Sequence, residues 1–158
     1  MAAHRRPAEK EKPIRPADYQ RLAAFRHTLR RFLAFSEAAA RSAGITPQQH
    51  QALLAIKGAP SPADVTVGYL AQQLLLQPHS AAELADRMVN CGLLTRAEAA
   101  DDRRRVVLSL TSTAENALHA LSAAHIRELR HSVPVIDSLS ELFEPKPAGG
   151  HRRRTGRK

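Results

Sequence analysis

The chain has 158 residues, a length that suits one folded domain with short flanking segments. Apolar residues make up 43% of it, enough for a single core, whereas aromatic residues make up 4% and Trp is absent, so aliphatic side chains must dominate the packing. A single cysteine excludes an intrachain disulfide framework and favours a reducing, cytoplasmic location. We identify no signal peptide and no apolar run of the ~20 residues that a membrane span needs, and therefore expect no membrane partner.

The net charge of +9 is concentrated at the two ends of the chain. Residues 1–17 carry +3 and residues 144–158 carry +5, which leaves +1 for residues 18–143. The N-terminal segment is rich in Pro and charged residues, and the C-terminal segment is rich in Pro, Gly and Arg. Both are predicted to be disordered basic tails. Basic tails attract polyanions without reading sequence, so the high charge does not by itself predict a DNA-binding groove in the folded part.

A long first helix is predicted from Asp18, as its N-cap, to about Ala43, with Gly44 as the residue that ends it. Because this helix is long for its share of the chain, we expect it to pack beyond its own subunit. Its apolar side chains recur at helical spacing, and they are Tyr19, Leu22, Phe25, Leu29, Phe32 and Leu33.

Two short helices and a tight turn follow a helix that starts at Thr46. Thr46, Pro47 and Gln49 form a strong start signal, with Ala52, Leu53 and Ile56 facing inward. Thr66 caps the next helix, whose inward residues are Val67, Leu70, Ala71 and Leu74. The helix after the turn spans 78–91, with Ala81, Leu84, Ala85 and Met88 inward and Gly92 ending it.

The turn between these two helices lacks the residues that usually stabilise such a turn. Such turns often contain glycine, because one residue needs a positive φ, but this chain offers Leu75 and Leu76. Gln77 is a poor N-cap for the second helix, although Pro78 suits its first position. We therefore expect the second helix to be held less rigidly than usual.

Two strand-like runs, 93–96 and 106–110, flank the charged segment 97–105. A further helix begins at 111–113 and is broken by Pro134, and a short last helix extends to Phe143. The inward stripe of the further helix is Ala114, Leu118, Leu121, His125 and Leu129. Helix, tight turn, helix and β-hairpin together predict a mostly α fold with a small β-hairpin wing, a winged helix-turn-helix.

Specific residues within this layout resemble the MarR (multiple antibiotic resistance regulator) family over about residues 18–143. The most specific part is the Asp-Arg-Arg of the wing followed by a strand that ends in Leu-Thr. The residues that carry the resemblance are Leu70, Ala71, Leu74, Leu84, Asp86, Arg87, Gly92, Leu93, Arg96, Asp102, Arg103, Arg104, Leu110 and Thr111.

The resemblance implies a homodimeric transcriptional regulator, typically a repressor, that binds a pseudo-palindromic operator in double-stranded DNA. It implies N- and C-terminal dimerisation helices at 18–43 and 112–143, and a DNA-binding part at about 46–111. The helix at 78–91 would be the recognition helix and would enter the major groove, and a wing Arg would enter the minor groove. Many such proteins also hold a small-molecule effector between these two parts, which would release the DNA.

Candidate DNA contacts lie on the recognition helix and the wing. Arg104 is the residue expected in the minor groove, where negative potential is concentrated. Asp102 is expected to orient an Arg, either Arg104 or Arg87, through a bidentate pair. The start of the recognition helix has free N–H groups that suit a phosphate. The predicted DNA-binding residues are Gln77, His79, Ser80, Arg87, Arg103, Arg104 and Arg105.

Each of these predictions has a simpler alternative. The wing arginines could form a solvated hairpin tip, and His79 and Ser80 could only cap their helix. Glu83, on the outward face with Arg87, could accept a hydrogen bond from cytosine N4 or remain solvated. For the whole chain, the alternatives are a non-specific nucleic-acid binder driven by the basic tails, and a winged-helix protein-interaction module.

Other chemistry is not indicated. Cys91 lies at a helix C-terminus, whose partial negative charge does not favour a reactive thiolate, so a redox role is not favoured. The eight His residues show no metal-ligand spacing, although His27 and His50 could line an effector pocket or lie on the surface. We find no nucleophile elbow, phosphate loop or paired metal motif, and predict neither enzyme activity nor a cofactor.

Overall fold

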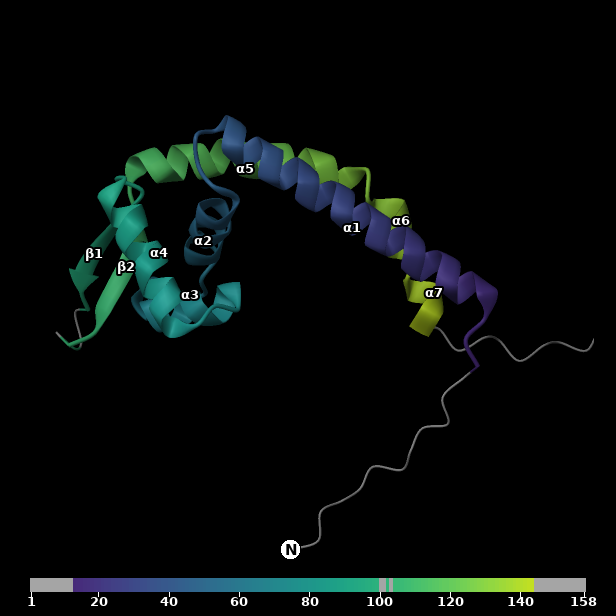
Figure 1. Ribbon diagram of the computed structural model, residues 1–158, viewed down its shortest axis with the longest axis horizontal. Coiled ribbons are helices and arrows are strands. Elements are labelled where there is room, and N and C mark those ends of the chain that lie inside the picture. Colours follow the sequence, from purple (N-terminus) through teal and green to yellow (C-terminus); the bar gives the residue numbers. More distant parts are fainter. Residues whose placement is uncertain (1–12, 100–101, 103, 144–158) are drawn as a thin grey trace, which may run out of the picture. The chain divides into compact units, whose positions relative to one another are not determined.

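The structure is a computed structural model that describes residues 13–99, 102 and 104–143 (Figure 1). Most of both predicted basic tails, and Arg103 of the wing, lie outside the described residues. The chain divides into two compact units. One is residues 30–131, and the other contains residues 13–29 and 132–143.

The elements follow the predicted order, and the fold class is confirmed: the described chain is mostly helical with one two-stranded antiparallel hairpin. The elements are α1 Pro16–Ser42, α2 Pro47–Lys57, the 3-10 helix η1 Pro62–Asp64, α3 Val67–Leu74, α4 Pro78–Asn90, β1 Leu94–Glu98, β2 Val106–Leu110, α5 Ser112–Arg130, α6 Val133–Ser138 and α7 Ser140–Phe143.

The two ends of the helical chain differ from the prediction. α1 begins at Pro16, so Asp18 lies in the first turn and is not the N-cap; its carboxylate accepts a hydrogen bond from the Arg15 backbone N–H at 2.9 Å. The last segment is two short helices, α6 and α7, instead of one. Pro134 occupies the first turn of α6, where its missing N–H costs no helical hydrogen bond.

The helix start at Thr46 and the helix ends at Gly44 and Gly92 form as predicted. The Thr46 hydroxyl accepts from the Gln49 backbone N–H at 3.1 Å, and the Gln49 side chain accepts from the Thr46 N–H at 2.8 Å, which completes a capping box. Gly44 and Gly92 have φ values of 78° and 72°, so these two helix ends use a left-handed conformation that glycine adopts without strain.

The core of residues 30–131 includes the buried faces of α4 and of the hairpin. All four residues predicted to face inward from α4 are buried: Ala81, Leu84, Ala85 and Met88. The largest fully buried side chains come from α2, the segment before α3, α3, α4 and both strands, and they are Leu53, Val65, Leu70, Met88, Leu94 and Leu108. Burying each such side chain contributes roughly 1.5–3 kcal/mol, so this core fixes how α4 is presented.

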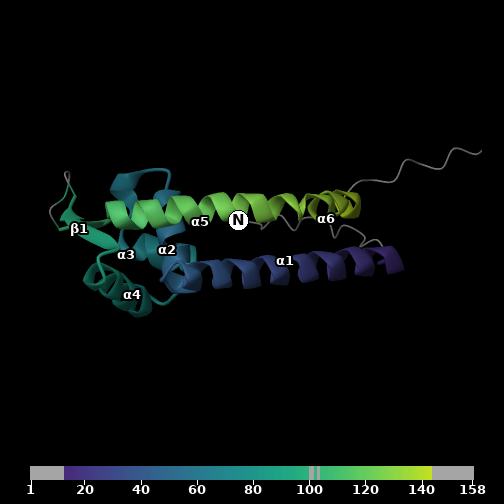
Figure 2. The same cartoon turned by 90° about the horizontal axis from the view of Figure 1, so that it is seen from above.

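The hairpin pairs in register from Leu94 opposite Leu110 to Glu98 opposite Val106. In Figures 1 and 2 it projects beyond the N-terminal end of α5, next to α3 and α4. A backbone contact ties it to the segment before α3, because the Leu108 N–H donates to the Val65 carbonyl at 2.8 Å. The wing is therefore linked to the helix-turn-helix through main chain as well as through side chains.

Within the described residues, no helix combines the length and hydropathy that crossing a bilayer requires.

Candidate nucleic-acid interface

The turn between α3 and α4 has the backbone conformation that glycine usually supplies. Leu75 has φ 54° and ψ 40°, and its side chain is 92% exposed. Leu76 then donates its N–H to the Ala71 carbonyl at 2.9 Å, which closes the end of α3. A left-handed residue that is not glycine costs about 1–2 kcal/mol. The predicted need for a positive φ at this junction is thus confirmed, and Leu75 meets it.

The N-terminus of α4 is open to solvent. Gln77 occupies the N-cap position in an extended conformation and its side chain makes no capping hydrogen bond, so the weak cap expected from the sequence is confirmed. His79 is exposed and Ser80 is half-buried in the first turn. Unsatisfied N–H groups and the positive end of the helix dipole make such a terminus suited to a phosphate oxygen.

Charged residues further along α4 are involved in pairs. Arg87 is exposed and lies 3.8 Å from Glu83 on the same helix face, a loose contact between two solvated groups. Asp86 pairs more closely with Arg96 of β1, with 2.6 Å between Oδ1 and Nη1. This second pair joins α4 to the first strand of the wing, whereas Arg87 stays exposed to solvent.

The wing shows how Asp102 acts. Its Oδ1 accepts a hydrogen bond from the Arg104 backbone N–H at 2.9 Å, which shapes the turn and leaves the Arg104 side chain exposed. The contact is therefore to the main chain of Arg104, whereas the sequence predicted a bidentate pair with a guanidinium. Arg103 lies outside the described residues.

Arg105 lies closer to the body of this unit than the sequence indicated. Its Nη1 is 3.1 Å from Oδ1 of Asp64, and its side chain is 29% exposed. The sequence missed Asp64, which lies in η1, in a Pro-rich loop 41 residues earlier. No local pattern indicates a contact of this range.

The MarR family profile matches residues 43–105, which run from the end of α1 to the wing. This segment belongs to the MarR family. Proteins of the family are transcription regulators and not enzymes, in agreement with the sequence-based expectation. No curated protein matches the chain.

Solved structures share the MarR fold over most of the chain. AbsC, a MarR family transcriptional regulator from Streptomyces coelicolor, is 18% identical with a TM-score of 0.63, covering 84% of this chain and 90% of AbsC. RV1404 from Mycobacterium tuberculosis is 19% identical with a TM-score of 0.65, covering 90% and 100%. A variant of MepR from S. aureus bound to an oligodeoxyribonucleotide is 17% identical with a TM-score of 0.59, covering 79% and 95%.

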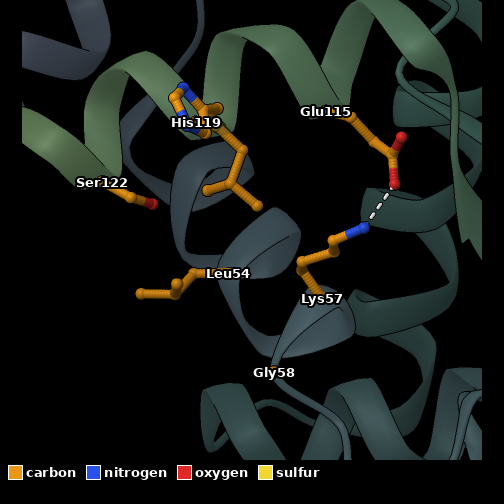
Figure 3. Close-up of a pocket in the computed structure, with 7 residues that line it drawn as sticks. Leu54, Lys57, Gly58, Glu115, His119 and Ser122 are labelled. Atoms are coloured by element: carbon orange, nitrogen blue, oxygen red, sulfur yellow. Dashed lines mark hydrogen bonds and ion pairs between the residues drawn. The ribbon is translucent and has the colours of Figure 1, made fainter.

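A hollow of about 280 Å³ lies between α2 and α5 of this MarR-type fold (Figure 3). Lys57 and Glu115 form an ion pair at its edge, with 2.5 Å between Nζ and Oε1. The lining residues are Leu54, Lys57, Gly58, Glu115, Leu118, His119 and Ser122. His50, which the sequence associated with an effector pocket, is not among them; it is buried against His125, while His27 is exposed.

Cys91 is exposed at the C-terminal end of α4, where its thiol donates a weak hydrogen bond to the Met88 carbonyl at 3.5 Å. Gln49 Nε2 lies 3.7 Å from the same sulfur. Among the residues that the structure describes, no cluster of three or more His, Cys, Asp or Glu side chains is arranged to hold a metal ion.

Proposed function

We propose that this MarR-type regulator binds a pseudo-palindromic operator in double-stranded DNA as a homodimer. The observation that carries the proposal is the joint exposure of two DNA-compatible features in one unit. They are the uncapped N-terminus of α4 and the guanidinium of Arg104 on the wing. The first suits phosphate and the edges of bases in the major groove, and the second suits a narrow minor groove.

Each predicted contact has a distinct role in this proposal. His79 and Ser80, with Gln77 at the N-cap position, enter the major groove at the start of α4, and Arg87 approaches the backbone from its outward face. Arg104 inserts into the minor groove. Arg103 is proposed from the sequence alone, and Arg105 acts near the base of the wing, next to its Asp64 partner.

Dimerisation is supported by a row of exposed apolar side chains on α1. Burying such a row against a second copy is favourable, because contiguous exposed apolar surface is uncommon on monomers. Its members are Tyr19 (61% exposed), Leu22, Leu29 and Leu33. On α6, Val133 and Ile136 are also exposed. Two recognition helices related by a two-fold axis would read half-sites about 10–10.5 base pairs apart.

We further propose that the protein acts as a repressor by occupying its operator. A small molecule that binds better to a dimer whose recognition helices are wrongly spaced would release the DNA, by shifting the population toward that form. The hollow between α2 and α5 is one place for such an effector.

The test is selection of bound fragments from genomic DNA by the full chain, at near-physiological salt and with excess non-specific competitor. The proposal expects enrichment of one palindromic class, with a loss of at least about tenfold in affinity for Arg104→Ala, the equivalent of ~1.4 kcal/mol. Arg127→Ala is the matched control, because Arg127 is an exposed arginine on α5.

Other outcomes identify the alternatives. Unselective binding that disappears when residues 1–12 and 144–158 are removed would mean that the basic tails provide the affinity. A stable complex with another protein, together with indifference of DNA binding to Arg104→Ala, would indicate a protein-interaction module. A strictly monomeric protein at micromolar concentration would contradict the homodimer.

A further inference from the structure

Arg105 and Asp64 form an ion pair between two segments that lie 41 residues apart in the sequence. The Arg105 Nη1 to Asp64 Oδ1 distance is 3.1 Å, with side-chain exposures of 29% and 69%. Asp64 ends η1, and Arg105 immediately precedes β2. The pair therefore joins the base of the wing to the segment that leads into α3.

Main-chain hydrogen bonds place both residues at structural junctions. The Arg105 carbonyl accepts from the Ala99 N–H at 2.8 Å, and the Arg105 N–H donates to the Asp102 carbonyl at 2.9 Å. At the other side, the Asp64 carbonyl accepts from the N–H of Thr66, the residue that caps α3. Main-chain hydrogen bonds thus connect Arg105 to the wing and Asp64 to the start of α3.

Stability alone does not account for this pair. An exposed ion pair contributes little to folding, because water screens the two charges and ordering the two side chains costs entropy. Moreover, an acidic side chain beside a DNA-binding wing repels phosphate, so its net electrostatic effect on DNA affinity is unfavourable. Asp64 therefore disfavours DNA binding by its charge, yet it holds Arg105 of the wing. This combination fits a role in orienting the wing.

We propose that Asp64 and Arg105 are positioning residues that set the angle of the wing so that Arg104 reaches the minor groove while α4 lies in the major groove. This inference rests on the proposed function and adds a determinant of specificity to it. In this role Arg105 contributes through Asp64 more than through direct contact with a phosphate.

The first experiment needs no DNA. Amide hydrogen exchange of Ala99 and Leu108 is measured by NMR in the full-length wild type and in Asp64→Asn, with Leu53 in the core as an internal reference. We expect exchange at Ala99 and Leu108 to become several-fold faster while Leu53 is unchanged. Glu115→Gln, which breaks the Lys57 ion pair elsewhere in the same unit, is the matched control. Unchanged exchange at both wing amides would overturn the proposal.

The second experiment uses the sign of the effect on DNA binding. Simple removal of a negative charge would tighten binding to the selected operator, whereas loss of positioning weakens it, by about fivefold to tenfold, and lowers the ratio of specific to non-specific affinity. Asp64→Glu and Arg105→Lys should retain part of the affinity. The double variant Asp64→Asn with Arg105→Gln should bind the operator no less tightly than whichever of its two single variants has the lower affinity.

The outcomes separate this inference from the function on which it rests. If the wild type selects no operator, the proposed function fails, and the exchange measurement still decides whether the pair positions the wing. If the wild type selects an operator and Asp64→Asn binds it as tightly or more tightly, the positioning role is wrong and the proposed function stands.

Discussion

The imidazole of His50 on α2 packs against the imidazole of His125 on α5, with ring centroids 4.7 Å apart and planes tilted by 33°. Both side chains are buried. From α1, the rings of Phe32 and Phe35 meet His125 edge-on, and the Ser36 hydroxyl lies 2.8 Å from its Nε2. On α5, the Leu121 carbonyl lies 2.5 Å from the His125 Nδ1. Two titratable groups thus share one apolar junction of three helices.

This junction predicts a pH-dependent stability. Burial, and secondarily the charge of His125, lowers the pKa of His50 below its ordinary value of 6.5. The folded state therefore binds fewer protons than the unfolded state. The stability that depends on neutral His50 is fully present above about pH 6.5. It is lost as the pH falls from there toward the pKa of His50 in the folded state. Urea unfolding at pH 7.5 and pH 5.5 should show a lower free energy of unfolding at pH 5.5.

The matched variants isolate His50 from the other histidines. His50→Gln should flatten the pH dependence of the unfolding free energy over this window, whatever it does to the absolute value. His79→Gln, which changes an exposed histidine, should leave the dependence as in the wild type. An unchanged dependence in His50→Gln would show that another group is responsible.

Leu75→Gly is expected to stabilise the protein. The leucine has φ 54° and is almost fully exposed, so glycine removes the left-handed strain and loses no buried surface. Relief of about 1–2 kcal/mol exceeds the glycine entropy cost of roughly 0.5–1 kcal/mol. The net gain in the free energy of unfolding, measured with urea, is therefore about 0–1.5 kcal/mol. Leu76→Gly, at a half-buried neighbour without positive φ, should destabilise the protein.

Thr111→Val is expected to lower the free energy of unfolding by about 1–2 kcal/mol. The Thr111 hydroxyl accepts from the Ala114 N–H at 3.2 Å as the cap of α5 and donates to the Gly92 carbonyl at 2.7 Å, just after α4. Valine keeps the shape and removes both hydrogen bonds. Thr111→Ser keeps the hydroxyl and should remain within about 0.5 kcal/mol of the wild type.

Glu83→Gln is expected to strengthen DNA binding by about threefold to tenfold, the equivalent of roughly 1 kcal/mol. The carboxylate lies on the exposed face of α4 and is 3.8 Å from Arg87, so its removal lowers repulsion and releases that arginine for a phosphate. Titration of a labelled operator fragment measures the change, with Glu115→Gln as the control. Weaker binding would instead indicate that Glu83 contacts a base directly.

Local signals accounted for most of the elements. The capping box at Thr46, the positive φ of Gly44 and Gly92, and the apolar spacing of α4 each act over a few residues, so the sequence is sufficient to predict them. The boundaries at the two ends were less accurate. The proline-bearing segment after α5 folds as two helices, the first of which has no side-chain cap, and α1 begins before Asp18.

The sequence by itself determined the order of elements, the inward face of α4, and which residues could contact DNA. Only the tertiary structure decided which side chains from distant segments meet. It paired Arg105 with Asp64, directed Asp102 to the main chain of Arg104, and buried His50 against His125. Helix and turn formation depends on neighbours within about four residues, whereas contacts between distant segments depend on how the whole core packs.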